Sequence, residues 1–213
     1  MAGELVEIPL NGTSLDGELV VPEGARGLVI FVHGSGSSRL SPRNNYVARV
    51  LREAGLATFL FDLLTAGEDQ VYANRFDIPL LTQRLVMVVR WMRGKNGIRD
   101  LPVGLFGSST GAAAALRGAV ELGDEIATVV SRGGRPDLAG EALDRVGAPV
   151  LLIVGGLDQV VIDLNREAQA RLPEGSHLEI VPGATHLFEE EGKLERVAEL
   201  ASQWFRDHLG ASP

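Results

Sequence analysis

The stretch that decides the fold is Val103–Leu116, "VGLFGSSTGAAAAL". A short apolar run ends in glycine and serine, and an alanine-rich segment follows directly. This order is typical of a buried strand that turns sharply into a helix. The spacing Gly-x-Ser-x-Gly places Ser109 midway between Gly107 and Gly111. Small flanking residues are what a strained turn needs to present a nucleophile, so Ser109 is a candidate nucleophile. A glycine-rich turn without activity is the alternative.

Outward from this turn, short apolar runs alternate with segments of helical periodicity. Strands are expected at 5–8, 17–21, 27–33, 56–63, 103–108, 126–131, 149–156 and 177–183, and helices at 41–55, 77–95, 110–121, 135–146, 160–172 and 192–209. The alternation predicts an α/β fold whose mostly parallel sheet carries helices on both faces. A hairpin turning at 12–17 adds antiparallel strands at one edge. With no internal repeat or linker, residues 1–213 are expected to form one domain.

Composition excludes several classes of function. The chain has 20 basic and 28 acidic residues, a formal charge of −8, which argues against a broad nucleic-acid interface. It contains no cysteine, which removes disulfides, thiolate metal sites and a cysteine nucleophile. Its apolar runs are too short to span a membrane and no signal peptide is visible, so a cytoplasmic protein is expected. The oligomeric state stays open.

Two further strand ends carry an acid and a base. Asp158 follows the strand at 149–156, and His186 follows the strand at 177–183. The chain order Ser109, Asp158, His186 is the order of a nucleophile, acid and base in α/β-hydrolases. Taken singly, Asp158 also fits a helix N-cap and His186 an exposed loop residue. Asp137 and Asp163 are weaker candidates for the acid.

The loop "HGSGSSR" after the strand at 27–33 is a candidate second part of an oxyanion hole. Its backbone N–H donor is expected from Ser35, with Gly36 as the other candidate, and the first donor from Thr110. His33 is expected to shape this loop rather than to titrate in catalysis. The two remaining histidines, His177 and His208, are interpreted as structural.

The segments "VHGSGSS", "GSSTGAA", "LLIVGGLD" and "VPGATHLFEE" together resemble the α/β-hydrolase superfamily, in its small dienelactone-hydrolase-like branch. The resemblance implies an eight-stranded sheet with one antiparallel strand, and Ser109, His186 and Asp158 as nucleophile, base and acid. One departure concerns the nucleophile. Dienelactone hydrolases use a cysteine there, and this chain has a serine, so their substrate is not carried over.

The chemistry expected is hydrolysis of small carboxylic esters through an acyl-Ser109 intermediate, with no metal or organic cofactor. The alternatives are a thioesterase or other acyl hydrolase, and a hydrolase-fold protein, natural or engineered, whose reactive serine turns over little. The short segment between the strands at 126–131 and 149–156 leaves no room for a large lid, which favours small acyl groups. Arg39, Arg132 and Arg135 are candidate ligands for a substrate carboxylate or phosphate, or else plain surface arginines. The polar segment at 63–77 is a candidate mobile rim of the pocket, or else a plain surface loop.

Overall fold

The computed structural model describes residues 3–10 and 12–210. Eight strands form one sheet: β1 (Glu4–Leu10), β2 (Thr13–Val20), β3 (Leu28–Val32), β4 (Ala57–Phe61), β5 (Val103–Ser108), β6 (Ile126–Arg132), β7 (Val150–Gly155) and β8 (His177–Val181). The α-helices are α1 (Pro42–Glu53), α2 (Ala66–Asp69), α3 (Ile78–Arg93), α4 (Thr110–Leu122), α5 (Gln159–Gln169) and α6 (Lys193–Leu209). Three 3₁₀ segments complete the described part: η1 (Tyr72–Phe76), η2 (Gly123–Glu125) and η3 (Pro136–Arg145).

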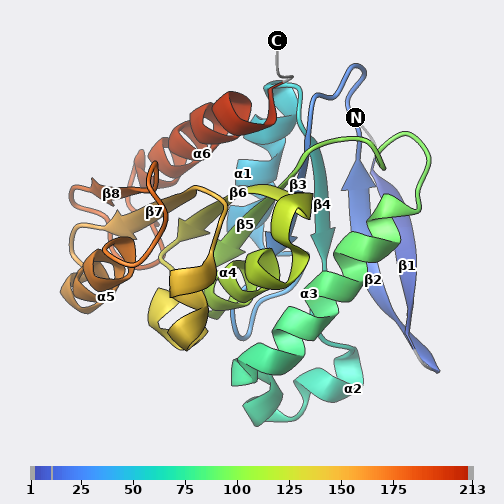
Figure 1. Ribbon diagram of the computed structural model, residues 1–213, viewed down its shortest axis with the longest axis horizontal. Coiled ribbons are helices and arrows are strands. Elements are labelled where there is room, and N and C mark those ends of the chain that lie inside the picture. The colour runs from blue at the N-terminus through green and yellow to red at the C-terminus, as the bar shows by residue number, and fades with distance from the viewer. Residues whose placement is uncertain (1–2, 11, 211–213) are drawn as a thin grey trace.

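The sheet has the order β1-β2-β4-β3-β5-β6-β7-β8 and is not closed (Figure 1). Strand β2 is antiparallel to both of its neighbours, and the ladders from β4 to β8 are parallel. The expected α/β-hydrolase fold, with its single antiparallel strand, is therefore confirmed. After β3 the chain forms β4 on one side of β3 in the sheet and then β5 on the other side. Loops diverge at such a switch point, and ligands bind there in open α/β sheets.

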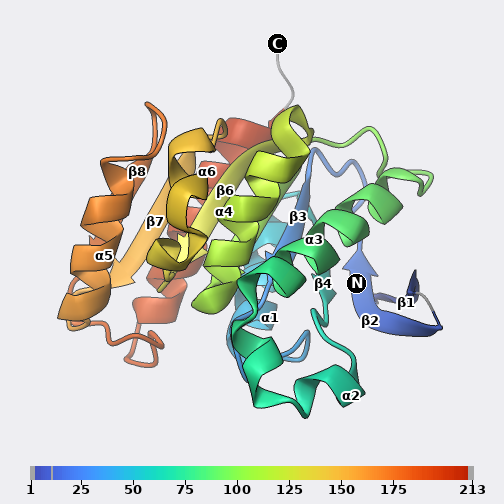
Figure 2. The same cartoon turned by 60° about the horizontal axis from the view of Figure 1, so that its bottom comes forward.

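The two larger of three apolar clusters among the described residues lie between the sheet and its helices, one on each face. On one face, α1 and α6 bury Leu51, Ala201 and Phe205 against the sheet. On the other face, α3 and α4 contribute Leu85, Val89 and the alanines of α4. Figure 2 shows the two layers, with α3, α4 and α5 in front of the sheet and α1 and α6 behind it. The segment between β6 and β7, all of it described, holds only η3, which leaves no room there for a large lid.

Two expectations on chain organisation are wrong. The predicted turn at 12–17 is shorter, because β2 already begins at Thr13 and pairs with β1 as far as Leu10. The buried pair Ile8 and Leu15 explains this, since the apolar cross-strand contact outweighs the turn-forming residues around it. The segment at 63–77 is also no plain loop. It contains α2, whose capping box joins Thr65 and Glu68, and η1.

The described residues include no helix that combines the length and the apolarity needed to cross a bilayer.

Candidate active site

Ser109 lies at the sharp turn between β5 and α4. Its backbone has φ 50° and ψ −124°, a left-handed conformation that a serine adopts only under constraint. The constraint comes from three main-chain hydrogen bonds. The Ser109 N–H donates to the Arg132 carbonyl over 3.2 Å, and the Ser109 carbonyl accepts from the N–H groups of Ala112 and Arg135, each over 3.1 Å. Main-chain bonds to β6, to the segment after β6 and to α4 thus hold the turn in place.

The glycines around Ser109 are required by close backbone contacts. A Cβ at Gly111 would collide with the carbonyl oxygens of Val32 and His33, and a Cβ at Gly107 would collide with Ala112 in α4. Gly34, in the loop after β3, would bring a Cβ within 2.9 Å of the Ser109 Cβ. The spacing read from the sequence therefore corresponds to a place where two loops and a helix start meet.

We expect the substitution Gly111→Ala to destabilise the protein strongly. The added methyl group faces carbonyl oxygens of β3 and its loop, which cannot move without disturbing the sheet, so a loss of about 3 kcal/mol in the free energy of unfolding is expected. Urea unfolding followed by circular dichroism measures it. Gly67→Ala, in α2 with open space around its Cα, is the control and should change stability by less than about 1 kcal/mol. Equal effects of the two substitutions would contradict this explanation.

Asp158 and His186 form a hydrogen bond across the loops after β7 and β8. The distance from His186 Nδ1 to Asp158 Oδ2 is 2.7 Å. Asp158 occupies the N-cap position of α5, yet its side chain makes no capping bond and is directed to the histidine instead. A proton on Nδ1 then leaves Nε2 as the basic nitrogen of the neutral ring.

The two loops approach each other closely. A Cβ at Gly155 would collide with the carbonyl oxygens of Ala184 and Thr185, and the Leu157 N–H donates to the Ala184 carbonyl over 2.9 Å. Phe188, two residues after His186, is buried and has a φ of 57°. Asp158 and His186 are thus held by backbone packing as well as by their own hydrogen bond.

A cavity of about 240 Å³ lies between the loop after β3, the Ser109 turn and the loop after β8. Its lining consists of Gly34, Ser35, Ser37, Ser41, Arg43, Ser108, Ser109, Arg132, His186 and Leu187. Ser109 and His186 therefore face the same small space, and Asp158 contacts His186 from outside it. Within residues 12–210 the two side chains are not hydrogen-bonded to each other. Catalytic hydrogen bonds of this kind often tighten only when substrate binds.

Of the two expected oxyanion donors, Ser35 lines this cavity and Thr110 directly follows Ser109 in the chain. Thr110 is the first residue of α4, where N–H groups lack partners inside the helix. The Ser35 N–H donates to the Thr110 hydroxyl oxygen over 2.8 Å, which couples the loop after β3 to the start of α4. Both backbone amides thus lie close to the Ser109 turn, and the Ser35 amide already donates to the Thr110 hydroxyl.

The three arginines expected near the site have different surroundings. Arg39 pairs with Asp62 and Asp16, and Arg135 forms a two-pronged ion pair with Asp137 at 2.7 and 2.8 Å. Neither lines the cavity, whereas Arg132 does.

Sequence reasoning missed Arg43, which also lines the cavity. Its position on the first turn of α1, directly after the glycine loop, is the signal that would have indicated it.

His33 is buried beneath the glycine loop. The Leu63 N–H donates to its Nε2 over 3.0 Å, so Nδ1 carries the proton and donates to the Gly34 carbonyl over 3.0 Å. Burial lowers the pKa of the His33 imidazole below its usual value. A neutral ring with both nitrogens bonded fits the expected loop-shaping role.

This arrangement predicts a loss of stability in mild acid. Because the His33 pKa is lower in the folded protein, protons bind the unfolded chain first. The free energy of unfolding is therefore expected to fall as the pH drops below about 6.5. Urea unfolding between pH 7.5 and about 5 measures the slope. His33→Gln, which removes the titrating ring, should flatten it, and an unchanged slope in that variant would assign the effect to other groups.

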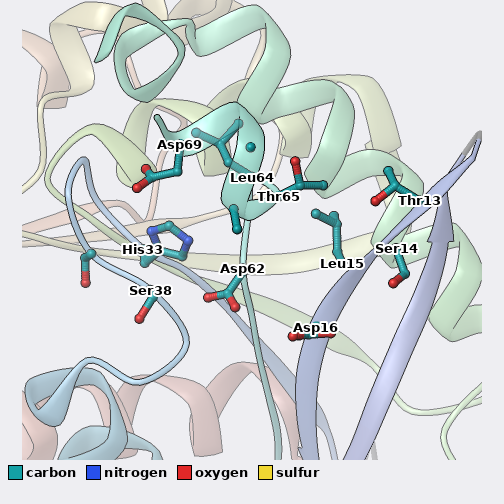
Figure 3. A pocket seen from close by; sticks show the side chains of 13 residues that line it. Thr13, Ser14, Leu15, Asp16, His33, Ser38, Asp62, Leu64, Thr65 and Asp69 are labelled. Carbon is teal, nitrogen blue, oxygen red and sulfur yellow. The ribbon is translucent and has the colours of Figure 1, made fainter. Parts of the chain in front are cut away.

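A larger cavity of about 630 Å³ lies beside the site, and Ser37 contributes to both cavities. Its lining includes three carboxylates, Asp16, Asp62 and Asp69, together with His33 (Figure 3). Ser109 and His186 are not among its lining residues. Among the described residues, no group of three or more histidine or acidic side chains has a metal-binding arrangement.

Two solved structures are similar to this chain over almost its whole length. The crystal structure of dienelactone hydrolase from Anabaena variabilis is 51% identical, covers 97% of each chain and superposes with a TM-score of 0.93. The chain belongs to the dienelactone hydrolase family. Its fold is also that of Est1E from Butyrivibrio proteoclasticus, at 17% identity, a TM-score of 0.83 and coverage of 97% and 99% of the two chains.

This dienelactone hydrolase family member also has relatives that carry a different name. Two proteins of Mycobacterium tuberculosis named "Putative phosphoribosyl transferase" are 57% identical over 206 residues, which are 97% of this chain and 46% of theirs. The chain thus spans about half the length of these curated relatives. No family model matches the sequence. Membership of the family supports a hydrolase of the ester-cleaving type.

Proposed function

We propose that the protein is a serine hydrolase that cleaves small carboxylic esters through an acyl-Ser109 intermediate. The observation that carries the proposal is the single cavity that Ser109 and His186 share, with the Asp158 carboxylate 2.7 Å from the far nitrogen of the histidine. A nucleophile on a strained turn, a base and an orienting acid in this relation are the parts of covalent acyl transfer.

The reaction has two halves. The Ser109 oxygen attacks the ester carbonyl while His186 Nε2 takes the hydroxyl proton, and the resulting imidazolium is stabilised by Asp158. The proton then passes to the departing alkoxide oxygen as the carbon–oxygen bond breaks, which leaves the acyl group on Ser109. In the second half, His186 takes a proton from water, the resulting hydroxide attacks the acyl carbonyl, and Ser109 recovers the proton on release of the carboxylic acid.

The negative oxygen of each tetrahedral intermediate needs donors in a fixed position. The Thr110 N–H at the start of α4 supplies one, assisted by the helix dipole. The Ser35 N–H supplies the second by exchanging the Thr110 hydroxyl for the oxyanion, a stronger acceptor. The cavity of about 240 Å³ and the short segment between β6 and β7 favour short acyl groups.

A thioesterase would use the same groups, because its reaction also passes through an acyl-serine. The phosphoribosyl transferase name describes proteins about twice as long as this chain. We assign hydrolase chemistry to this chain because Ser109, His186 and Asp158 lie together in it.

Labelling and turnover together test the proposal. A fluorophosphonate probe should attach to the peptide that contains Ser109, located by mass spectrometry, and the protein should release p-nitrophenol from p-nitrophenyl acetate. Faster cleavage of a matched acyl-thioester would favour the thioesterase. Labelling without turnover would show that Ser109 is reactive but that the protein does not hydrolyse esters. The absence of labelling would overturn Ser109 as the nucleophile.

A further inference from the structure

Asn165 is a buried amide that joins α5 to the chain after β6. It lies seven residues after Asp158, the N-cap of α5, which is about two helical turns, and it is fully buried. Its Nδ2 atom donates to the Gly134 carbonyl over 3.0 Å and to the Val161 carbonyl of its own helix over 2.8 Å. One side chain thus connects the helix that begins at Asp158 with the segment that follows β6.

The segment that Asn165 holds, residues 133–135, contacts both the Ser109 turn and His186. The Arg135 N–H donates to the Ser109 carbonyl over 3.1 Å. Gly133 lies so close to His186 that a Cβ there would be 3.1 Å from the histidine carbonyl oxygen and 3.5 Å from the ring atom Cε1. A shift of this segment would therefore move the serine relative to the histidine.

The backbone of this segment depends on its neighbours for its position. Two glycines in succession, Gly133 and Gly134, give it little stiffness of its own. The Gly133 N–H donates to the Ile153 carbonyl of β7 over 2.8 Å, which fixes the start of the segment. Gly134 is buried, and its carbonyl accepts from Asn165. A buried carbonyl needs a partner, so loss of the Asn165 amide would favour movement of the segment.

Space filling alone does not explain an amide at position 165. Within the described part of the chain, the Oδ1 atom of Asn165 is buried and has no hydrogen-bond partner. A buried polar atom without a partner is costly, and a leucine would fill a similar space without that cost. The amide is explained by the carbonyl that its nitrogen holds, that of Gly134.

We propose that Asn165 is a positioning residue, which holds residues 133–135 and thereby keeps Ser109 and His186 in the relation that proton transfer between them requires. This inference rests on the proposed ester hydrolysis for its effect on rate. Within residues 12–210 the two side chains share a cavity without a mutual hydrogen bond, so their approach depends on the backbone that carries them. A displacement of about 1 Å between reacting groups costs roughly 100-fold in rate.

The kinetic test uses two substitutions of Asn165. Asn165→Leu removes both donor bonds, whereas Asn165→Ser keeps one, because a serine hydroxyl reaches the Val161 carbonyl one turn back but is too short for Gly134. For p-nitrophenyl acetate we expect both variants to lower kcat by roughly 10- to 100-fold, with KM within about threefold of the wild type. Fluorophosphonate labelling should slow by a similar factor. A raised KM at an unchanged kcat would overturn the positioning role.

Thr128→Val is the matched control for a general loss of stability. Thr128 is fully buried near the start of β6, where its hydroxyl donates to the Pro149 carbonyl over 2.8 Å and accepts from the Trp204 indole over 2.6 Å. The substitution should lower the melting temperature, because it breaks buried hydrogen bonds, but leave kcat within a factor of about two. Wild-type kcat in both Asn165 variants, or an equal loss of kcat in Thr128→Val, would overturn the positioning role.

Amide hydrogen exchange, followed by NMR, separates this proposal from the proposed function. After correction for the change at the Ile30 amide in β3, the Arg135 N–H should exchange at least about 10-fold faster in Asn165→Ser than in the wild type or in Thr128→Val. Faster exchange in a protein that neither labels nor turns over would overturn the hydrolase and keep the hold of Asn165 on residues 133–135. Unchanged exchange at Arg135 would overturn the positioning role, whatever the activity.

Discussion

Ser109→Ala is expected to lower kcat for p-nitrophenyl acetate by about 10⁴- to 10⁶-fold and to abolish fluorophosphonate labelling. Without its oxygen no acyl-enzyme forms, and only the oxyanion donors and binding contacts remain to accelerate attack by water. The variant should fold normally, because the bonds that fix position 109 are main-chain bonds. Initial rates and intact-mass spectrometry measure the two losses.

Ser108→Ala is the matched control for this experiment. Ser108 is the last residue of β5 and also lines the cavity, but its backbone belongs to the strand and not to the strained turn. We expect it to keep most of the labelling. If Ser108→Ala loses labelling and Ser109→Ala keeps it, the nucleophile has been placed one residue too late.

Asp158→Asn is expected to lower kcat by about 10⁴-fold with little change in the fold. An amide at this position can donate to Nδ1 of His186, which favours the tautomer with the proton on Nε2 and removes the base from Ser109. A profile of kcat against pH measures the effect, since the loss should persist across the neutral range.

Asp163→Asn provides the comparison for that variant. Asp163 lies in the same helix, α5, and contacts Gln159 and Arg166 on the exposed surface. Its replacement should leave kcat within a factor of about two, as surface substitutions usually do. A similar loss in both variants would point to a general effect on α5 and against a role for Asp158 as the acid.

The sequence predicted those parts of the structure that depend on local patterns. The strand, turn and helix around Ser109 follow from adjacent residues. So do the starts of the helices expected at 41–55 and 77–95, where Ser41 and Asp77 cap α1 and α3. The eight-stranded sheet follows from alternation along the chain together with the resemblance. The start of β2 was not predictable in the same way, because pairing with β1 decides it.

The surroundings of the arginines were also beyond prediction. Arg39, Arg132 and Arg135 all follow strand ends or loops near the site, and the sequence ranks them equally. Ion pairs with residues distant in sequence turn Arg39 toward Asp62, and a local pair turns Arg135 toward Asp137. Arg132 remains at the cavity because no acidic side chain competes for it there.

Residue 132 takes part in the site through its main chain. Its carbonyl accepts a hydrogen bond from the backbone N–H of Ser109, and Arg132 also lines the cavity that Ser109 shares with His186. Because every amino acid has this carbonyl, the residue type at position 132 can change in evolution without loss of the bond that holds the Ser109 turn.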